Sequence, residues 1–346
     1  FAADYAYFSS FSTTWLQHAE TYVAAMIERF RLNAASYVVE VAANDGYLLQ
    51  YVKARGIPCL GIEPTASTAA AAQEKGIAIA AGFFGVRLAH ELAEQGRQAD
   101  LAIANNVLAH VPDINDFVAG FALLLKPAGV ATFEVPHLLR MVAGNQFDTI
   151  YHEHFSYLSL TVMIHIFQQN GLTVFDVEEL PTHGGSLRVF VQRQNTGLRS
   201  PSNRVAELLA DEATAGIATS GYYAGFQARA DQVKNDLLVF LIEAKHAVKK
   251  VAAYGAAAKG NTLLNYAGVR PDLLPWVVDR NPAKQGKFLP GNRIPIVAEA
   301  RLHEEKPDLI LILPWNLKEE IMYQISYIKK WGGRFVTAVP TLAMWA

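Results

Sequence analysis

Hydrophobic and polar positions near the start of this chain follow the order strand, turn, helix, strand. Residues 37–42 are a short apolar run that predicts a buried parallel strand, and small residues with Asn44 and Gly46 follow it. Residues 47–55 carry apolar side chains at helical spacing, and residues 59–62 predict a second buried strand that ends at Glu63. The segment 38–64 therefore predicts a βαβ unit with a tight turn and a carboxylate at its strand tips.

The same alternation continues along the chain. Further strands are predicted over 77–80, 100–104 and 130–135, with helices over 65–75, 86–95, 112–125 and 161–170. The runs 173–178 and 186–192 predict an antiparallel edge to this sheet. A second α/β unit is predicted from strands over 251–254, 276–278, 309–313 and 334–339, with helices over 259–267 and 317–330.

These elements predict a doubly wound α/β domain followed by a second, Rossmann-like α/β domain. The expected division is an N-terminal lid or helix over 1–33, with a helix at 13–30, then a ligand-binding domain with a catalytic loop over 34–195. A helical connector over 196–250 and a C-terminal domain over 251–346 complete the chain.

Composition narrows the class of function. The chain has 346 residues, 51% of them hydrophobic, which is long enough for two cores. A net charge of −2 gives no basic footprint for nucleic acid, and no apolar run approaches the ~20 residues that span a bilayer. The single cysteine, Cys59, lies in an apolar strand, which fits a reducing, cytoplasmic location. Small-molecule chemistry is the expected function.

The first turn favours a particular kind of ligand. A carboxylate at the tip of a second strand, Glu63, is suited to accept hydrogen bonds from a ribose diol. A dinucleotide site is expected to show G-x-G-x-x-G, whereas this turn has only Gly46 and carries its own anion, Asp45. The turn therefore favours a positively charged ligand without phosphate, such as S-adenosylmethionine (SAM), over NAD. A βαβ unit that binds neither is the alternative.

Residues that follow the other strands are further candidates, because ligands of doubly wound sheets lie beyond the carboxyl ends of the strands. Phe83 and Phe84 could cover an adenine ring or could belong to the core. Asn105, Asn106 and His110 follow the fourth strand and could contact a ligand. A helix-capping asparagine and a surface histidine are the competing interpretation.

The densest group of ionisable residues is the sequence YHEHFSY at 151–157. A metal site is one interpretation, but H-E-H lacks the helical H-E-x-x-H spacing. General acid–base catalysis is preferred, with Tyr151 and His154 as the proton-handling pair and Glu153 orienting the histidine. No metal is expected in this chain. His183 precedes two glycines in a loop with room for a ligand.

The second unit has its own turn after its first strand. Backbone N–H groups at a helix start, together with Lys259 and Asn261, could hold an anion or phosphate. Asp279 ends the next strand, and Trp315 and Asn316 follow another, with an indole face suited to a nucleobase. A vestigial nucleotide-binding fold kept for packing is the alternative.

Eight motifs, in order, resemble one family: the SAM-dependent C-methyltransferases that act on nucleotide-activated keto-deoxysugars in deoxysugar biosynthesis. They are YAYFSS (5–10), NDGYLL (44–49), GIEP (61–64), YHEHFSY (151–157), HGGSLR (183–188), KGNTLLN (259–265), VDRNPAKQG (278–286) and LPWNL (313–317). The chain differs from the family pattern at Ala42, where a glycine is frequent. The resemblance implies a class I SAM-methyltransferase domain and a C-terminal Rossmann-like domain on the side of the substrate nucleotide.

The resemblance also implies roles for residues. The cofactor would contact the turn and the strand tips: Ala42, Asn44, Gly46, Glu63, Pro64, Phe83, Phe84, Asn105 and Asn106. The counterparts of His154 and Tyr151 are candidates for the base, with His110 nearby, and Tyr5, Tyr7 and Phe8 would line the sugar site. His183, Lys259, Asn261, Asp279, Trp315 and Asn316 would contact the nucleotide sugar. The family carries an N-terminal cysteine-rich zinc segment, and this chain is expected to begin after it.

The chemistry that follows is removal of a proton next to a ketone, stabilisation of the enolate, and attack of its carbon on the sulfonium methyl group. His154 is the first candidate for the base, with Tyr151 as the second or as the oxyanion donor. An O- or N-methyltransferase acting on a small molecule is one alternative function. A non-catalytic nucleotide-sugar binding protein is the other.

Overall fold

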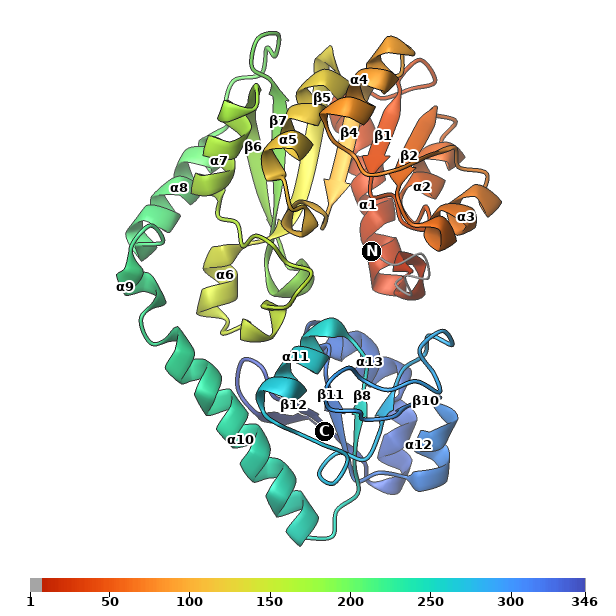
Figure 1. Cartoon of the computed structure of the whole chain (residues 1–346), viewed down its shortest axis with the longest axis vertical. Helices are drawn as coiled ribbons and strands as arrows, with labels where there is room; N and C mark the ends of the chain where they lie inside the picture. The colour runs from red at the N-terminus through yellow and green to blue at the C-terminus, as the bar shows by residue number, and fades with distance from the viewer. Residues whose placement is uncertain (1–7, 346) are drawn as a thin grey trace. The chain divides into compact units, whose positions relative to one another are not determined.

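The computed structural model describes residues 8–345, so Tyr5 and Tyr7 lie outside the described residues. The chain forms two compact units. The first unit comprises the chain up to Leu139 and Phe155–Ala218, and the second comprises Arg140–His154 and the chain from Thr219 on. Each unit is built around its own sheet (Figure 1).

The sheet of the first unit has seven strands in the order β3-β2-β1-β4-β5-β7-β6. The strands are β1 (Val38–Val41), β2 (Cys59–Glu63), β3 (Ile79–Ala81), β4 (Ala99–Asn105), β5 (Leu125–Pro136), β6 (Leu172–Leu180) and β7 (Ser186–Arg193). The first five pair in parallel, whereas β7 runs antiparallel to both β5 and β6. The predicted doubly wound sheet with an antiparallel edge is confirmed.

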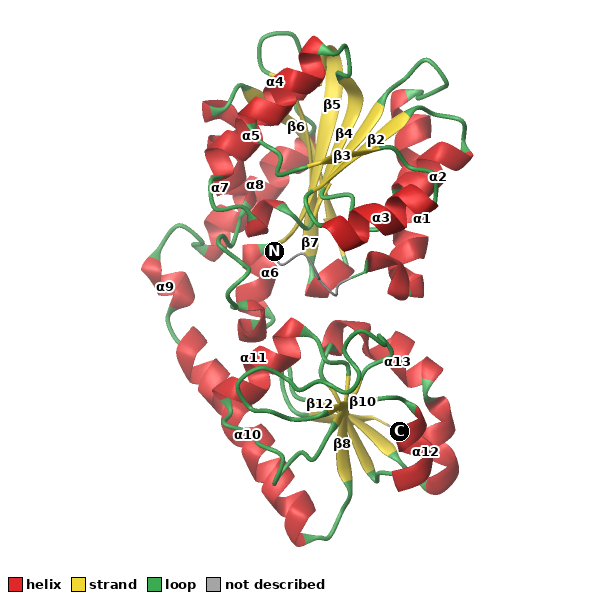
Figure 2. Ribbon diagram, turned by 45° about the vertical axis from the view of Figure 1, so that its right-hand side comes forward, coloured by secondary structure: helices red, strands yellow, loops and turns green. Residues whose placement is uncertain are grey.

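Helices cover both faces of this sheet (Figure 2). Successive residues of a strand point to opposite faces, so Val38 packs with one apolar cluster and Val39 with another. The first face is covered by α1 (Thr13–Phe30), α2 (Leu49–Ala54) and α3 (Ala66–Glu74), and the second by α4 (Val86–Glu94), α5 (Ile114–Leu124), α7 (Leu160–Gln169) and α8 (Asn203–Ala215).

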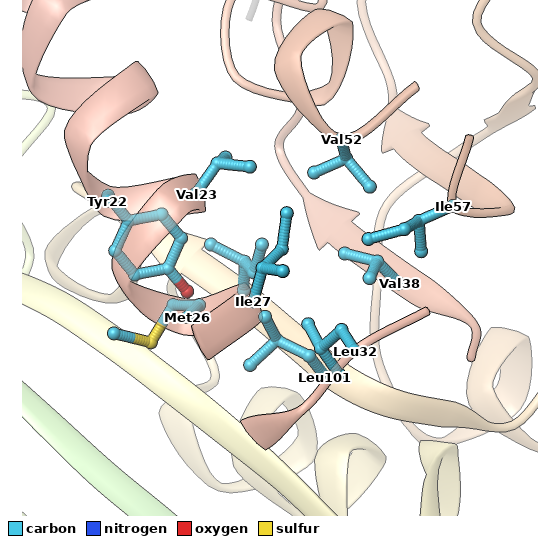
Figure 3. A pocket seen from close by; sticks show the side chains of 10 residues that line it. Tyr22, Val23, Met26, Ile27, Leu32, Val38, Val52, Ile57 and Leu101 are labelled. Atoms are coloured by element: carbon cyan, nitrogen blue, oxygen red, sulfur yellow. The ribbon is translucent and has the colours of Figure 1, made fainter. Parts of the chain in front are cut away.

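Helix α1 is part of this core. Tyr22 and Met26 are almost completely buried, and the hydroxyl group of Tyr22 lies 2.6 Å from that of Thr132 on β5. Figure 3 shows side chains of α1 facing β1 and α2 around a small apolar cavity. The cavity lies at the start of β1, beside Val38, whereas ligands of such sheets bind at the opposite ends of the strands. We therefore regard it as a packing gap.

The second unit has a six-stranded sheet in the order β10-β9-β8-β11-β12-β13, parallel except for β13. Its strands are β8 (Val251–Tyr254), β9 (Val277–Val278), β10 (Ile296–Val297), β11 (Leu309–Ile312), β12 (Arg334–Thr337) and β13 (Ala343–Trp345). Its helices are α9 (Ser220–Tyr223), α10 (Phe226–His246), α11 (Ala258–Tyr266), α12 (Ala300–Glu305) and α13 (Lys318–Gln324). The predicted second α/β domain is confirmed.

The two units divide the chain elsewhere than the four expected segments do. The expected connector is shared, because α8 packs on β6 and α7 of the first unit while α10 packs in the core of the second. The segment 140–154, which contains the end of α6 (Leu138–Ala143) and a 3-10 turn (Phe147–Thr149), belongs to the second unit. Among residues 8–345, no helix is both long and apolar enough to cross a membrane.

Candidate active site

The turn after β1 brings the backbone close to any ligand at the strand tips. Ala42, Asn44 and Gly46 all have left-handed backbone conformations, with φ of 58°, 49° and 73°. Such a turn reverses the chain within a few residues before α2 begins. Gly61 on β2 allows this turn to pack closely, because a Cβ there would lie 2.8 Å from the Cβ of Ala43.

Glu63 holds this turn in place. One carboxylate oxygen accepts a hydrogen bond from the N–H of Asn44 at 2.9 Å, and the other accepts one from Thr65 at the same distance. Each carboxylate oxygen has a second lone pair, so the group can still accept hydroxyl donors of a ribose. Pro64, the next residue, is partly buried.

The charge of Asp45 in this turn is paired with that of a lysine, which the sequence did not indicate. Lys75 places its Nζ 3.4 Å from Oδ2 of Asp45 and 2.6 Å from the carbonyl oxygen of the same residue. The N–H groups of Ser9 and Ser10 donate to the side chains of Asn44 and Asp45. The anionic turn is therefore paired with a cation, and the electrostatic argument against phosphate is weaker than the sequence implied.

Glu40, in the middle of β1, is a buried carboxylate to which sequence reasoning gave no role. Burial raises its pKa well above the usual value, the negative charges of Asp45 and Glu63 raise it further, and a hydrogen bond from Tyr47 opposes them. Burial therefore favours the neutral form of Glu40 beneath the turn. The signal was present, since an acidic residue inside an apolar strand is unusual.

Asn105 and Asn106 present buried amide groups at the end of β4. Asn106 has a left-handed backbone with φ of 53°, and neither its side-chain oxygen nor its nitrogen has a hydrogen-bond partner within residues 8–345. The side-chain oxygen of Asn105 also lacks one there. The helix-capping interpretation is not what the structure shows, because Asp113 caps α5. Buried amides without partners fit the amino and carboxylate groups of a bound methionine moiety. His110 closes the short 3-10 turn Leu108–His110 that follows.

The two phenylalanines after β3 separate. The ring of Phe84 is partly buried and packs edge-on against two core residues, Phe121 at 4.9 Å and Phe117 at 5.6 Å. This packing agrees with the core alternative, and a contact of Phe84 with the cofactor stays a prediction. Phe83 is 68% exposed and remains a candidate to cover an adenine ring.

His154 has a defined tautomer. Its Nδ1 lies 2.8 Å from the carbonyl oxygen of Thr149, and because a carbonyl only accepts, Nδ1 must carry the hydrogen. Burial lowers the pKa of His154, the Thr149 contact opposes this, and the positive charge of Lys259 lowers it further. The neutral ring therefore carries its lone pair on Nε2, as a general base requires. The ring of Tyr151 lies 4.2 Å away.

The orienting role that the sequence assigned to Glu153 belongs to Thr149. Glu153 is exposed, and the loop turns so that the N–H of His154 donates to the carbonyl of Tyr151. The side chains of both intervening residues, His152 and Glu153, are exposed to solvent. Neighbours in sequence are therefore not neighbours in space here.

Three residues of the second unit, Asp148, Trp315 and Asn316, converge around Lys259. Its Nζ lies 2.9 Å from Oδ1 of Asn316 and 4.8 Å from the centre of the Trp315 ring, and the indole N–H donates to Asp148 Oδ2 at 2.8 Å. Burial lowers the pKa of Lys259, which Asp148 opposes, and burial raises the pKa of Asp148 to about 6. Sequence reasoning identified Lys259, Trp315 and Asn316 but missed Asp148, which lies in no motif.

Asp279 in the second unit resembles Glu63 in the first. Its Oδ2 accepts from the N–H of Ala256 in the turn after β8, and its Oδ1 accepts from that of Asn281. The side-chain oxygen of Asn261, by contrast, lies within hydrogen-bond distance of Asn265 along α11. This bond uses the acceptor oxygen of Asn261 and leaves its Nδ2 group as the donor for the predicted anion contact.

His183 and Phe8 belong to the first unit. His183 has φ of 55° in a short 3-10 turn, and its ring centre is 5.2 Å from that of Trp15 on α1. Phe8 contacts Phe11 edge-on at 5.9 Å. Within residues 8–345, no group of three or more histidine, cysteine or acidic side chains could hold a metal ion.

A buried carboxylate at the end of β5 joins α1 to the His183 turn. Glu134 is completely buried and contacts His18 Nε2 at 2.9 Å, Arg188 at 3.0 Å and the Thr182 hydroxyl at 3.0 Å. His18 is 116 positions away in the sequence, so no local pattern could reveal the pair.

Comparisons with known proteins agree with this architecture. Residues 15–177 match a family model described as a methyltransferase domain, and residues 181–340 match one described as a C-methyltransferase C-terminal domain. The chain is 34% identical over 336 residues to the C-methyltransferase NovU of Streptomyces niveus, covering 97% of this chain and 80% of that protein.

The solved structures that this chain matches share little sequence with it. The magnesium protoporphyrin IX methyltransferase of Synechocystis PCC 6803 with bound S-adenosylhomocysteine is 16% identical, with a TM-score of 0.42, covering 51% of this chain and 83% of that one. The PH0226 protein of Pyrococcus horikoshii OT3 is 13% identical, with a TM-score of 0.44, covering 53% and 92%. The family models and the extended identity to NovU show that this chain belongs to the SAM-dependent C-methyltransferases.

Proposed function

We propose that this enzyme methylates a carbon next to the ketone of a nucleotide-activated deoxysugar, after removing a proton from that carbon. The observation that carries the proposal is the state of His154. Its Nδ1–H is held by the carbonyl of Thr149, and its lowered pKa keeps Nε2 able to accept a proton at neutral pH. Methylation of an oxygen or nitrogen atom does not require a base that removes a proton from carbon.

The residues at the strand tips of the first unit would hold the cofactor. Glu63 would accept hydrogen bonds from the ribose hydroxyls, and the side-chain amides of Asn105 and Asn106 would meet the amino acid moiety. The exposed ring of Phe83 would cover the adenine. SAM, when bound, supplies an electrophilic methyl group on a positively charged sulfur.

The second unit would hold the nucleotide sugar. Lys259 would contact the diphosphate, Trp315 a ring of the substrate, and Asp279 the ribose of the nucleotide. Tyr151, beside His154, would donate a hydrogen bond to the enolate oxygen or act as a second base. The oxyanion needs such a donor because negative charge develops there as the proton leaves.

Deuterium exchange tests the proposal. The enzyme is incubated in deuterium oxide with keto-deoxysugars linked to thymidine, uridine, guanosine or cytidine diphosphate, and exchange next to the ketone is followed by NMR. We expect exchange with one of them, methylation on the same carbon when SAM is added, and loss of both in His154→Asn. General-base catalysis contributes about 10²- to 10⁴-fold, so the loss should be in this range.

Matched variants and rival functions have distinct outcomes. Glu153→Gln should behave as wild type, because Glu153 is exposed, while His154→Asn should still bind SAM. Methylation without exchange would favour an O- or N-methyltransferase, and SAM left unconsumed with every sugar would favour a binding protein. Near wild-type turnover of His154→Asn would exclude His154 as the base.

The free cysteine of the enzyme, Cys59, and the proposed substrates fit a cytoplasmic location, which cell fractionation would test.

A further inference from the structure

The carbonyl group that orients His154 belongs to a tight turn of the second unit. Residues Phe147–Thr149 form a single 3-10 turn, in which both the N–H and the hydroxyl group of Thr149 donate to the carbonyl of Gln146. The ring of Phe147 packs against Tyr266 of α11 at 5.3 Å. The position of the Thr149 carbonyl therefore depends on how this turn is fixed to the rest of the unit.

Asp148 provides a polar anchor for the turn. It is completely buried, and its Oδ2 accepts the indole N–H of Trp315, which is 167 positions away in the sequence. A buried carboxylate is costly unless it is hydrogen-bonded, so its presence here needs a reason beyond packing. Asp148 immediately precedes Thr149, so the bond to Trp315 restrains the peptide whose carbonyl faces His154.

The same loop also holds Lys259. The Trp315 ring lies 4.8 Å from the Lys259 ammonium group, and Oδ1 of the neighbouring Asn316 accepts from it at 2.9 Å. One short loop after β11 thus contacts both the turn beside the proposed base and the lysine proposed to meet the substrate's phosphates.

We propose that Asp148 is a positioning residue for proton transfer: through its bond to Trp315, it holds the Thr149 carbonyl against Nδ1 of His154 and so keeps the lone pair on Nε2. The inference rests on the proposed role of His154 as base. It adds a residue that touches neither substrate nor cofactor and acts through the tautomer of the imidazole.

The tautomer of His154 can be measured without any substrate. Nitrogen-correlated NMR of histidine-labelled enzyme distinguishes a ring protonated at Nδ1 from one protonated at Nε2, and the His154→Asn spectrum identifies the signal. We expect the Nδ1–H form in wild type and a loss of its dominance in Asp148→Ala. Asp148→Asn keeps an oxygen that can accept from Trp315 and should retain the wild-type tautomer.

Kinetics provide the second measurement. A base in the wrong tautomer forfeits part of the about 10²- to 10⁴-fold that such a group contributes, so kcat of Asp148→Ala should fall about tenfold or more. The KM for SAM should not change, and Asp148→Asn should restore kcat. Glu299→Gln controls for loss of a partly buried carboxylate elsewhere in the second unit, where Glu299 accepts from Tyr254 and Tyr327, and should leave tautomer and kcat unchanged.

Trp315→Phe removes the donor and should shift the tautomer in the same direction, which keeps the test informative if Asp148→Ala does not fold. The double variant Asp148→Ala/Trp315→Phe should be no slower than Trp315→Phe alone, because both changes break one link. Wild-type tautomer in Asp148→Ala or Trp315→Phe, or multiplied losses in the double variant, would overturn the inference. A shifted tautomer in an enzyme that turns over none of the sugars would instead refute the proposed function.

Discussion

Removing the carboxylate of Glu134 should destabilise the first unit strongly. The group is completely buried at the end of β5 and receives hydrogen bonds from His18, Arg188 and Thr182 at 2.9 to 3.0 Å. In Glu134→Ala all three lose an acceptor. Arg188 keeps Glu178 as a partner at 3.1 Å, and its own side chain is only 7% exposed.

The size of the effect follows from this geometry. Breaking a buried ion pair by deleting one partner costs about 3 to 5 kcal/mol of unfolding free energy. Because Arg188 keeps its contact with Glu178, we expect a loss near the lower value, about 3 kcal/mol. For a unit of about 200 residues, 1 kcal/mol shifts the melting temperature by about 2 to 4 °C, so a drop of about 6 to 12 °C is expected. The exposed ion pair between Arg87 and Glu91 gives a matched control, because Glu91→Ala should change the melting temperature by less than about 2 °C.

The pH dependence has a definite sign. Burial would raise the pKa of Glu134, but the hydrogen bond and charge of His18, with the charges of Arg188 and His183, outweigh it and hold the pKa below its usual value. A lowered pKa stabilises the fold above the ordinary glutamate value of about 4, and the stabilisation is lost as the pH falls through the lowered pKa. The difference in melting temperature between wild type and Glu134→Ala should therefore become smaller at acidic pH.

Thermal melting followed by circular dichroism, repeated from neutral to acidic pH, measures both quantities. Glu134→Leu/Arg188→Met replaces the whole pair with apolar groups and should recover much of the stability lost in Glu134→Ala. A melting temperature of Glu134→Ala within about 2 °C of wild type, or a loss that does not vary with pH, would refute the account of this cluster.

Two further variants test polar side chains of the first unit, Glu40 in β1 and Asn106 after β4. Burial raises the pKa of Glu40, so the contribution of this group to stability should be fully present below the ordinary glutamate pKa and should be lost as the pH rises through the raised pKa. Glu40→Gln should remove this loss when melting temperatures are measured across pH. Parallel pH profiles of melting temperature for wild type and variant would contradict the prediction. Asn106→Ala deletes a buried amide that lacks a partner among residues 8–345, so it should weaken SAM binding by about tenfold in titration calorimetry, whereas unchanged affinity would remove Asn106 from the cofactor site.

Sequence patterns predicted the fold where they were long and periodic. The helix expected over 13–30 has the bounds Thr13–Phe30, and the strands of the first sheet lie where apolar runs placed them. Short elements were missed, because the two residues of β10 and the three of β13 carry no periodicity. The helix expected over 317–330 ends at Gln324 and continues after Ile325 as a 3-10 helix. Periodicity also cannot show that 140–154 packs with the second unit.

The candidate site divides in the same way. Residues at strand tips, such as Glu63 and Asp279, could be found because topology brings the ends of parallel strands to one edge. The partners that tune chemistry could not, because the pairs Trp315–Asp148 and His18–Glu134 join distant segments without any local signal. Glu153 shows the converse, since adjacency to His154 in the sequence suggested a contact that the turn of the loop prevents.

The two units tie their strand-tip acids to the preceding turn in the same way but surround them with different charges. In the first unit Glu63 accepts from Asn44, and Lys75 pairs with Asp45 in the turn, so these groups together comprise two carboxylates and one lysine. In the second unit Asp279 accepts from Ala256, the turn 255–258 contains no acidic residue, and Lys284 donates to the Ala256 carbonyl. An excess of carboxylates suits a sulfonium cation, whereas a turn without an acid and with an adjacent lysine suits phosphate. The charge difference between two similar folds therefore supports SAM on the first unit and a nucleotide on the second.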